Sequence, residues 1–270
     1  MLFQLLALRN RFTYIRQMRR VLTFFLCFYG FIALSAQHGA VATVDPLATD
    51  AAVRVMKKGG NAIDAAVAAG LTLGVVNGYN SGIGGGCFIV ARLSNGRVIT
   101  INGRETAPAK AHRDMYLRNG KPDTGLSQIG PLASGVPGAL AAYAQLAKAH
   151  GKLPLRVHLE TAATVAEKGF AIPAAYAGRI QATAKGLAKF PASGALFLKA
   201  DGSPKVAGNL LKQPDLARTY RAIAKEGTGW FYGGPFARKT ELWMKDNGGI
   251  LAARDFMNYK TTSPPPVRTT

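Results

Sequence analysis

One arginine stands where it could bind a substrate. Arg104 follows a segment with strand character and precedes Glu105 and a Thr-Ala-Pro turn. The rigid guanidinium fork of arginine binds a carboxylate through two parallel hydrogen bonds. The alternative is a surface ion pair of Arg104 with Glu105 or Asp114, which is a common arrangement that adds little stability. Spacing alone favours the ion pair, so a carboxylate anchor needs further support.

The other reactive side chains form no recognisable catalytic set. The four histidines are dispersed and provide no metal-ligand pair, which predicts surface histidines or histidines satisfied within the core. They are His38, His112, His150 and His158. Cys87 begins an apolar segment without a basic neighbour, which predicts an inert buried thiol. No G-x-S-x-G nucleophile elbow is present, and we expect neither a metal nor another cofactor. A Ser or Thr nucleophile activated by its own amino group would stay hidden in an uncleaved precursor.

A glycine-rich segment, Gly82–Gly86, does not fit a nucleotide-binding loop. That fingerprint lies between a strand and a following helix, whereas this segment lies between a predicted helix and a predicted strand. Two interpretations remain open, because glycine serves both. The segment is either a tight bend between packed elements or a close approach of the backbone to a ligand or a neighbouring strand.

The elements that must position Arg104 are a β-hairpin and a set of helices. Cys87–Leu93 and Arg97–Ile101 have strand composition, and Asn95-Gly96 between them predicts a two-residue turn. Capping residues, Gly and Pro set the helix boundaries. The predicted helices begin at Pro46 after Asp45 and at Ala62 after Asn61, and cover 138–150, 155–168, 174–188, 214–226 and 235–247. The alanine-rich helix after Asn61 is expected to be buried, and Leu196–Lys199 to be a short strand or a loop.

Charge argues against one class of partner. The 270 residues carry a formal net charge of +20, from 34 Lys and Arg against 14 Asp and Glu. The basic residues are scattered, and no zinc finger or basic arm is visible. We therefore expect a solvated basic surface and no nucleic-acid partner.

The first 36 residues predict a secretory signal peptide. Basic residues up to Arg20 precede the apolar run Val21–Leu34, and the small residues Ser35-Ala36 follow. The run is shorter than the ~20 residues that span a bilayer, so we expect no stable membrane anchor. Met18 is an alternative start. Removal of residues 1–36, which include Cys27, would leave one cysteine and no intrachain disulfide, as expected of a periplasmic or secreted protein.

The carboxyl-terminal part does not complete a layered architecture. The Pro-rich segment Ser263–Pro266 interrupts any helix shortly before Thr270. One hairpin and many helices do not make a closed α/β fold. We expect that another chain completes the sheet or that the sequence is a fragment.

Six segments in order resemble the amino-terminal half of the gamma-glutamyltransferases (glutathione hydrolases). These segments are His38–Ala42, Gly59–Ala68, Gly82–Phe88, Arg104–Pro108, Ser134–Gly138 and Asn247–Leu251. The resemblance implies that Arg104 is the arginine that grips the α-carboxylate of the substrate's glutamate, with Glu105 as a supporting residue.

The resemblance also implies an α+β fold, the αββα sandwich of the amino-terminal-nucleophile hydrolases. Residues 37–270 would form a helix-rich large-subunit part of it, incomplete in this chain, with a β-hairpin. In that family a precursor cleaves itself, and the new terminal threonine of the small subunit attacks the γ-glutamyl amide of glutathione and other γ-glutamyl compounds. The glutamyl group then passes to water or to an amino acid. The sequence ends before this threonine, so we expect no catalytic residue here, a small-subunit partner, and no activity of this chain alone.

Two departures from the family pattern keep alternatives open. Cys87 replaces what is often a glycine, and Gly103 stands where an aromatic residue is common. Gly103 would leave room beside Arg104, as a related acylase of the cephalosporin acylase type would require. A catalytically inactive truncated fragment is the third hypothesis.

Overall fold

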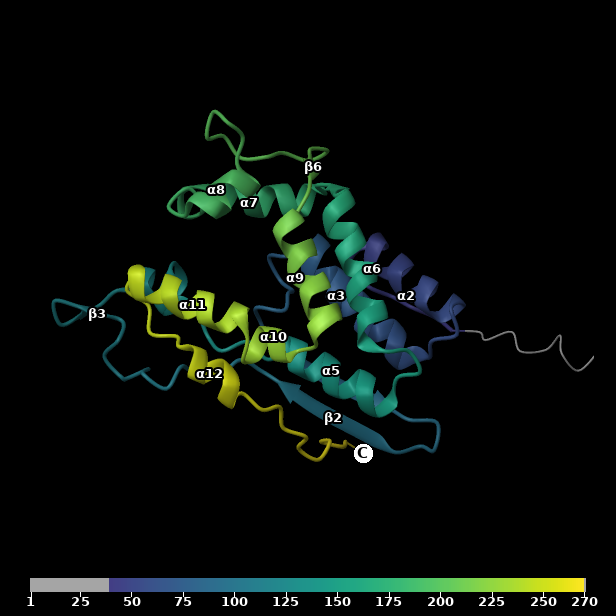
Figure 1. The fold of residues 1–270 in the computed structure, drawn as a ribbon. Coiled ribbons are helices and arrows are strands. Elements are labelled where there is room, and N and C mark those ends of the chain that lie inside the picture. Colours follow the sequence, from purple (N-terminus) through teal and green to yellow (C-terminus); the bar gives the residue numbers. More distant parts are fainter. Residues whose placement is uncertain (1–38, 270) are drawn as a thin grey trace, which may run out of the picture. The chain divides into compact units, whose positions relative to one another are not determined.

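A computed structural model describes residues 39–269 of the chain (Figure 1). The chain divides into two units, Met1–Ala40 and Val41–Thr270, and the fold below is that of the second. The predicted signal peptide, with Met18 and Cys27, and the first histidine, His38, lie outside the described residues. Among the helices of the described part, none is both long and apolar enough to cross a membrane.

Helices dominate the second unit, and the structure confirms the predicted long ones with ends within one residue. The helices are α2 (Pro46–Lys57), α3 (Ala62–Val76), α4 (Thr124–Gln128), α5 (Ala139–His150), α6 (Leu155–Lys168), α7 (Ala174–Leu187), α8 (Pro191–Phe197), α9 (Pro214–Glu226), α10 (Gly229–Tyr232), α11 (Pro235–Asp246), α12 (Ala253–Asn258) and the 3-10 helix η1 (Pro131–Ala133). The strands are β1 (Cys87–Arg92), β2 (Val98–Gly103), β3 (Leu117–Arg118), β4 (Lys121–Pro122), β5 (Phe170–Ala171) and β6 (Leu210–Leu211), paired antiparallel as β1–β2, β3–β4 and β5–β6.

The first two long helices start where their caps predict. The Asp45 carboxylate accepts a hydrogen bond from the backbone N–H of Leu47 at 2.9 Å. Asn61 and Asp64 exchange side-chain and backbone hydrogen bonds at 2.8 and 3.0 Å, which is a capping box. Helix α3 is largely buried, as predicted, because α2 and α6 both pack against it. Its alanines Ala65, Ala68 and Ala69 are buried, whereas Ala62 and Ala66 are exposed.

The main core lies among α3, α5, α6 and α9 and extends to the aromatic residues near the carboxyl end. Helix α6 packs against both α3 and α9. The largest fully buried side chains are Tyr220, Phe231 and Phe256. The Tyr220 hydroxyl donates a hydrogen bond to the Leu71 carbonyl at 3.0 Å, so its burial leaves no unpaired polar group.

The hairpin β1–β2 has one face against α5 and one face exposed. Its register pairs Cys87 with Gly103 and Arg92 with Val98, and α5 packs against both strands (Figure 1). Side chains alternate along β1, and Phe88 and Val90 are 71% and 73% exposed on the outer face. The outer face of the hairpin therefore presents two apolar side chains of one row to solvent.

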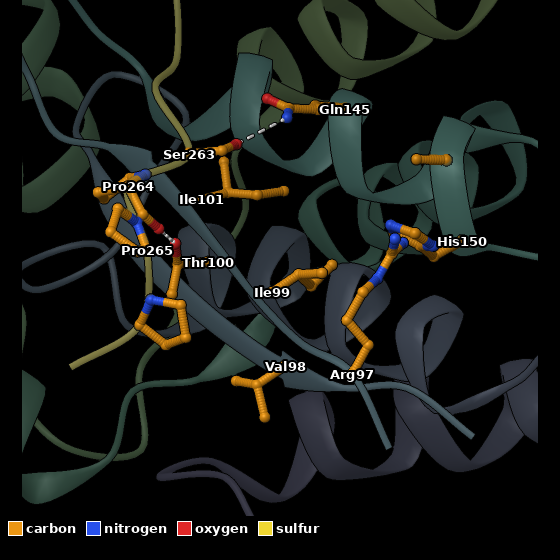
Figure 2. Close-up of a pocket in the computed structure, with 12 residues that line it drawn as sticks. Arg97, Val98, Ile99, Thr100, Ile101, Gln145, His150, Ser263, Pro264 and Pro265 are labelled. Carbon is orange, nitrogen blue, oxygen red and sulfur yellow. Dashed lines mark hydrogen bonds between the residues drawn. The ribbon is translucent and has the colours of Figure 1, made fainter. Parts of the chain in front are cut away.

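The chain after α12 returns along the outer edge of β2. Thr262 forms an antiparallel bridge with Asn102, with N···O distances of 2.7 and 3.1 Å. Figure 2 shows that the Thr100 hydroxyl donates to the Pro264 carbonyl and that the Gln145 amide of α5 donates to the Ser263 hydroxyl. A cavity of about 390 Å³ lies between these segments. The carboxyl-terminal segment thus continues the sheet by one short contact.

Two local predictions were wrong in part, and several short helices were missed. Leu196 and Phe197 belong to α8, and only Leu198, bridged to Pro204, is extended. The hairpin turn covers three residues, 94–96, closed by a Leu93 to Arg97 hydrogen bond of 2.9 Å. Gly96 adopts a φ of +81°, which glycine tolerates best, so the signal for a turn was correct while its length was not. The short helices α4, α8, α10 and α12 were not predicted.

Candidate active-site arginine

The backbone of Arg104 is fixed by one neighbouring residue and one residue distant in sequence. Its N–H donates a hydrogen bond to the side-chain oxygen of Asn102 in β2 at 2.9 Å. Its carbonyl accepts a hydrogen bond from the hydroxyl of Tyr259, just after α12, at 2.8 Å. The main chain is therefore held in place on both sides, while the side chain is 68% exposed.

The Arg104 side chain lies beside Glu105. Their Nη1 and Oε2 atoms are 3.2 Å apart, with side-chain exposures of 68% and 30%. Among the described residues Asp114 forms no ion pair with Arg104. The ion pair predicted as the alternative is therefore present. Because arginine carries five N–H donors, this pair leaves donors available, and carboxylate binding by Arg104 stays a prediction.

Glycines surround the Glu105 side chain. A Cβ atom at Gly86 would lie 2.6 Å from Glu105 Oε2, and one at Gly85 would lie 3.3 Å from Oε1. A Cβ atom at Gly135 would lie 3.2 Å from the Glu105 Cβ. The glycine-rich segment thus makes room for the Glu105 side chain, a neighbouring group that neither of the two interpretations named.

The same segment also connects to α5. The Gly85 carbonyl accepts hydrogen bonds from the N–H groups of Gly138 and Ala139, both at 3.0 Å. These donors belong to the first turn of α5, where backbone N–H groups lack partners inside the helix. Close contacts and hydrogen bonds therefore link the Glu105 side chain, the glycine segment and the start of α5.

The expected space beside Arg104 is not there. A Cβ atom at Gly103 would lie 2.6 Å from the Cβ of Ala142 and 3.1 Å from the Gly138 carbonyl oxygen. Helix α5 packs so closely on the end of β2 that only glycine fits at position 103. The interpretation of Gly103 as a source of room for a larger substrate is therefore wrong.

The Cys87 thiol and the Tyr259 hydroxyl, both affected by the charge of Glu105, are neutral near pH 7. Burial raises the pKa of the Cys87 thiol to about 11, and the Glu105 carboxylate adds to the shift. Burial also raises the pKa of the Tyr259 hydroxyl, with smaller contributions from Cys87 and Glu105. Cys87 is half-buried, and as a neutral thiol near pH 7 it is a poor nucleophile, as predicted.

His158 is a core histidine, as predicted. Its Nε2 lies 3.1 Å from Asp64 Oδ1, and both side chains are fully buried. Asp64 also accepts hydrogen bonds from the N–H groups of Lys152 and Leu153 at 2.9 and 3.2 Å. In the part of the chain that the structure describes, no three His, Cys, Asp or Glu residues form a group that could hold a metal ion.

Sequence reasoning named Arg104 and Glu105 but not the residues that hold the Arg104 main chain. Tyr259 carried no signal of its own, because a hydrogen bond between positions 104 and 259 leaves no local pattern. Asn102 lies two residues before Arg104, where an Asn side chain that accepts a backbone N–H two residues on is a local signal. The short spacing of Gly82–Gly86 was the one available clue to the space around Glu105.

The structure is similar to those of amino-terminal-nucleophile hydrolases. It aligns with gamma-glutamyltranspeptidase of Helicobacter pylori with a TM-score of 0.82 and 36% sequence identity, covering 86% of this chain and 67% of that chain. The fold class is thus the α+β class of these hydrolases, of which the described chain forms a helix-rich part with a hairpin.

Residues 48–270 match the family model for gamma-glutamyltranspeptidase, and the chain belongs to this family of enzymes. It is 37% identical over 239 residues to the glutathione hydrolase proenzyme of Escherichia coli (strain K12), covering 88% of this chain and 41% of that protein. It is also 37% identical over 241 residues to the acylase ACY 1 proenzyme of Pseudomonas sp. (strain SE83), covering 87% and 43%. The chain spans about two fifths of the length of these curated relatives.

Proposed function

We propose that this chain is the large-subunit portion of a gamma-glutamyltransferase. The complete enzyme cleaves the γ-glutamyl amide of glutathione and passes the glutamyl group to water or to an amino acid. The threonine nucleophile is supplied by the small subunit. The observation that carries the proposal is Arg104, an exposed guanidinium on a fixed main chain in a segment that matches the family.

The geometry suits a carboxylate anchor. Hydrogen bonds from both sides fix the Arg104 backbone, so little backbone freedom is lost when a ligand binds. Glu105 contacts one nitrogen of the guanidinium and restrains its orientation. The remaining N–H groups can bind a glutamate α-carboxylate through two parallel hydrogen bonds. Glu105 is thus a supporting residue in this proposal.

The outer face of β1–β2 supports a small-subunit partner. In a sandwich of two sheets, the inner faces pack about 10 Å apart and bury alternate side chains of each strand. Phe88 and Val90 occupy such alternate positions and are exposed here. A sheet supplied by the small subunit would cover them. The predicted signal peptide, residues 1–36, would direct the enzyme to the periplasm or the exterior.

The alternative is a related acylase, and one observation favours keeping it. The identity of 37% to the ACY 1 acylase proenzyme equals the identity to the E. coli glutathione hydrolase proenzyme. Overall similarity therefore does not separate the two substrate classes. Turnover of a γ-glutamyl anilide against a glutaryl-cephalosporin by the complete enzyme separates them, and turnover of neither substrate supports an inactive chain.

The test of the anchor is Arg104→Ala in the complete enzyme. Loss of a desolvated carboxylate partner should weaken γ-glutamyl substrate binding by on the order of 2–5 kcal/mol, which is at least ~30-fold in KM. Arg104→Lys should recover part of the loss, because lysine keeps the charge without the fork.

Arg118 offers a matched control. Its side chain is 67% exposed, and its Nε lies 3.3 Å from Asp123 Oδ2. Arg118 therefore has the exposure and the ion pair of Arg104 but lies outside the segment Arg104–Pro108. Arg118→Ala should leave KM unchanged. An unchanged KM in Arg104→Ala, or an equal rise in both variants, would show that Arg104 is a surface pair and not an anchor.

A further inference from the structure

A cavity of about 740 Å³ lies beside α7, away from Arg104. Its walls come from α7, from Phe190 and Phe197 around α8, from Gly78-Tyr79 after α3, and from residues 128–130. Its volume falls in the range of roughly 300–1,000 Å³ typical of small-molecule sites. Arg104, the residue on which the proposed function rests, is not among the lining residues.

Aromatic rings form one wall of this cavity. The rings of Tyr79 and Tyr176 are 4.9 Å apart and tilted by 60°, and Phe197 follows 6.2 Å from Tyr176. Phe190 also lines the cavity, near the loop, since a Cβ atom at Gly130 would be 3.7 Å from its ring. These flat apolar rings suit a flat apolar ligand.

Two cations line the cavity without an acidic neighbour. The lining residues include Arg179 and Lys185 and contain no Asp or Glu. The Arg179 guanidinium lies 5.9 Å from the centre of the Tyr79 ring, within the range of a cation–π contact. Within residues 39–269 neither cation forms an ion pair, although other exposed arginines of this unit do.

The combination defines a ligand class. A cation that contacts an aromatic ring and forms no ion pair keeps N–H groups available for an anion, and arginine prefers planar oxyanions. The aromatic wall beside it can hold an apolar body. We propose that this cavity is a second ligand site, for a small organic anion with a flat apolar body and a carboxylate or similar head bound by Arg179 and Lys185.

The experiment measures binding of 2-naphthoate to the complete protein by isothermal titration calorimetry. We expect saturable binding at one site, and binding of neutral 2-naphthamide at least ~10-fold weaker, because the amide lacks the charge. Both cations are exposed. Arg179→Gln should weaken 2-naphthoate binding at least ~10-fold and Lys185→Gln about 3-fold, because the arginine fork makes two parallel hydrogen bonds to a carboxylate and lysine does not.

Two controls locate the effect. Lys189→Gln removes an exposed lysine near α7 that does not line the cavity, and should leave binding unchanged. Arg104→Ala should also leave it unchanged, which separates this site from the proposed substrate anchor. Thermal unfolding of each variant checks folding, and Lys185→Gln repeats the test if Arg179→Gln is destabilised.

Three results would overturn the proposal. They are no binding of 2-naphthoate to the folded protein at about 1 mM, the weak limit for small ligands, equal binding of the amide, and equal weakening by Lys189→Gln and Arg179→Gln. Binding that Arg104→Ala alone abolishes would assign the probe to the substrate anchor instead.

Discussion

The Glu105 carboxylate needs the positive charge of Arg104 more than an exposed carboxylate in a surface ion pair would. Its Oε2 is buried and, among the described residues, has no hydrogen-bond partner of good geometry, although Arg104 Nη1 lies 3.2 Å away. The charge of Arg104 therefore compensates a carboxylate that the glycine segment shields from water. Part of the rise in KM in Arg104→Ala will come from the Glu105 carboxylate that is left without a compensating charge. Arg104→Lys keeps this charge but loses the fork, so it measures the loss of the two parallel hydrogen bonds to the substrate carboxylate separately.

Cys87 gives a prediction at the residue scale. Burial and then Glu105 raise the pKa of its thiol from 9.0 to about 11, so near pH 8 it should carry ~100-fold less thiolate than an unshifted thiol. Alkylation by iodoacetamide, followed by mass spectrometry of the peptide that contains Cys87, should be correspondingly slow in the native protein and fast in urea.

Glu105→Gln tests the cause of this shift. Removal of the carboxylate charge lowers the pKa of Cys87 and should speed alkylation, but by less than unfolding does, because burial is the larger cause. Native and unfolded protein alkylated at equal rates would contradict the shift.

At the scale of elements, the long helices could be predicted from the sequence because their signals are local. Asp45 and the Asn61–Asp64 box lie within three residues of the helix starts that they cap. Helix α10 could not be predicted, since four residues form a helix only with tertiary support. Its Phe231 is fully buried and stacks on Phe236 at 4.2 Å, in a different helix.

The candidate site divides in the same way. Arg104 and Glu105 stand in one short segment, so a sequence pattern contains both. The Tyr259 hydroxyl donates a hydrogen bond to the Arg104 carbonyl although the two residues are 155 positions apart. Ala142 of helix α5 fills the space beside Gly103 of strand β2. Such contacts depend on how α5 and the segment after α12 pack, which a local pattern does not contain.

Asp64 joins three elements and sets a pH dependence of stability. It caps α3, accepts N–H groups of the α5–α6 loop, and contacts His158 of α6. Burial would raise the pKa of Asp64, but its backbone donors and His158 together lower it. Burial lowers the pKa of His158, against the opposing effect of Asp64.

The sign of the dependence follows from the two shifts. Below about pH 6.5 the unfolded chain protonates His158 while the folded chain does not, so stability should fall as the pH decreases from 6.5. The slope for one proton is at most about 1.4 kcal/mol per pH unit. Asp64 adds a further loss below 3.8, as the pH falls through its lowered folded-state pKa.

Urea unfolding of the complete protein between about pH 7.5 and pH 5 measures the first effect. His158→Gln should flatten the dependence, whereas His112→Gln, at an exposed histidine, should not alter it. Asp64→Asn replaces an acceptor oxygen by a donor, which leaves at least one buried N–H of this network without its acceptor, and should destabilise the fold by about 1–3 kcal/mol. An unchanged slope in His158→Gln would exclude His158 as its origin.

At the scale of the whole molecule, the exposed outer face of β1–β2 is the structural feature that supports a covering small subunit. Val90 is 73% exposed on a strand of the hairpin, and Val44 is 78% exposed just before α2. If a second sheet covers the hairpin in the complete protein, Val90 becomes a core residue while Val44 stays in solvent.

Val90→Thr would then bury a hydroxyl and should lower the free energy of unfolding by about 1–3 kcal/mol. Val44→Thr should change it by less than about 0.5 kcal/mol. Chemical denaturation of both variants of the complete protein gives the comparison. Equal and small effects would mean that the hairpin face remains in water, and the argument for a covering small subunit would lose its structural support.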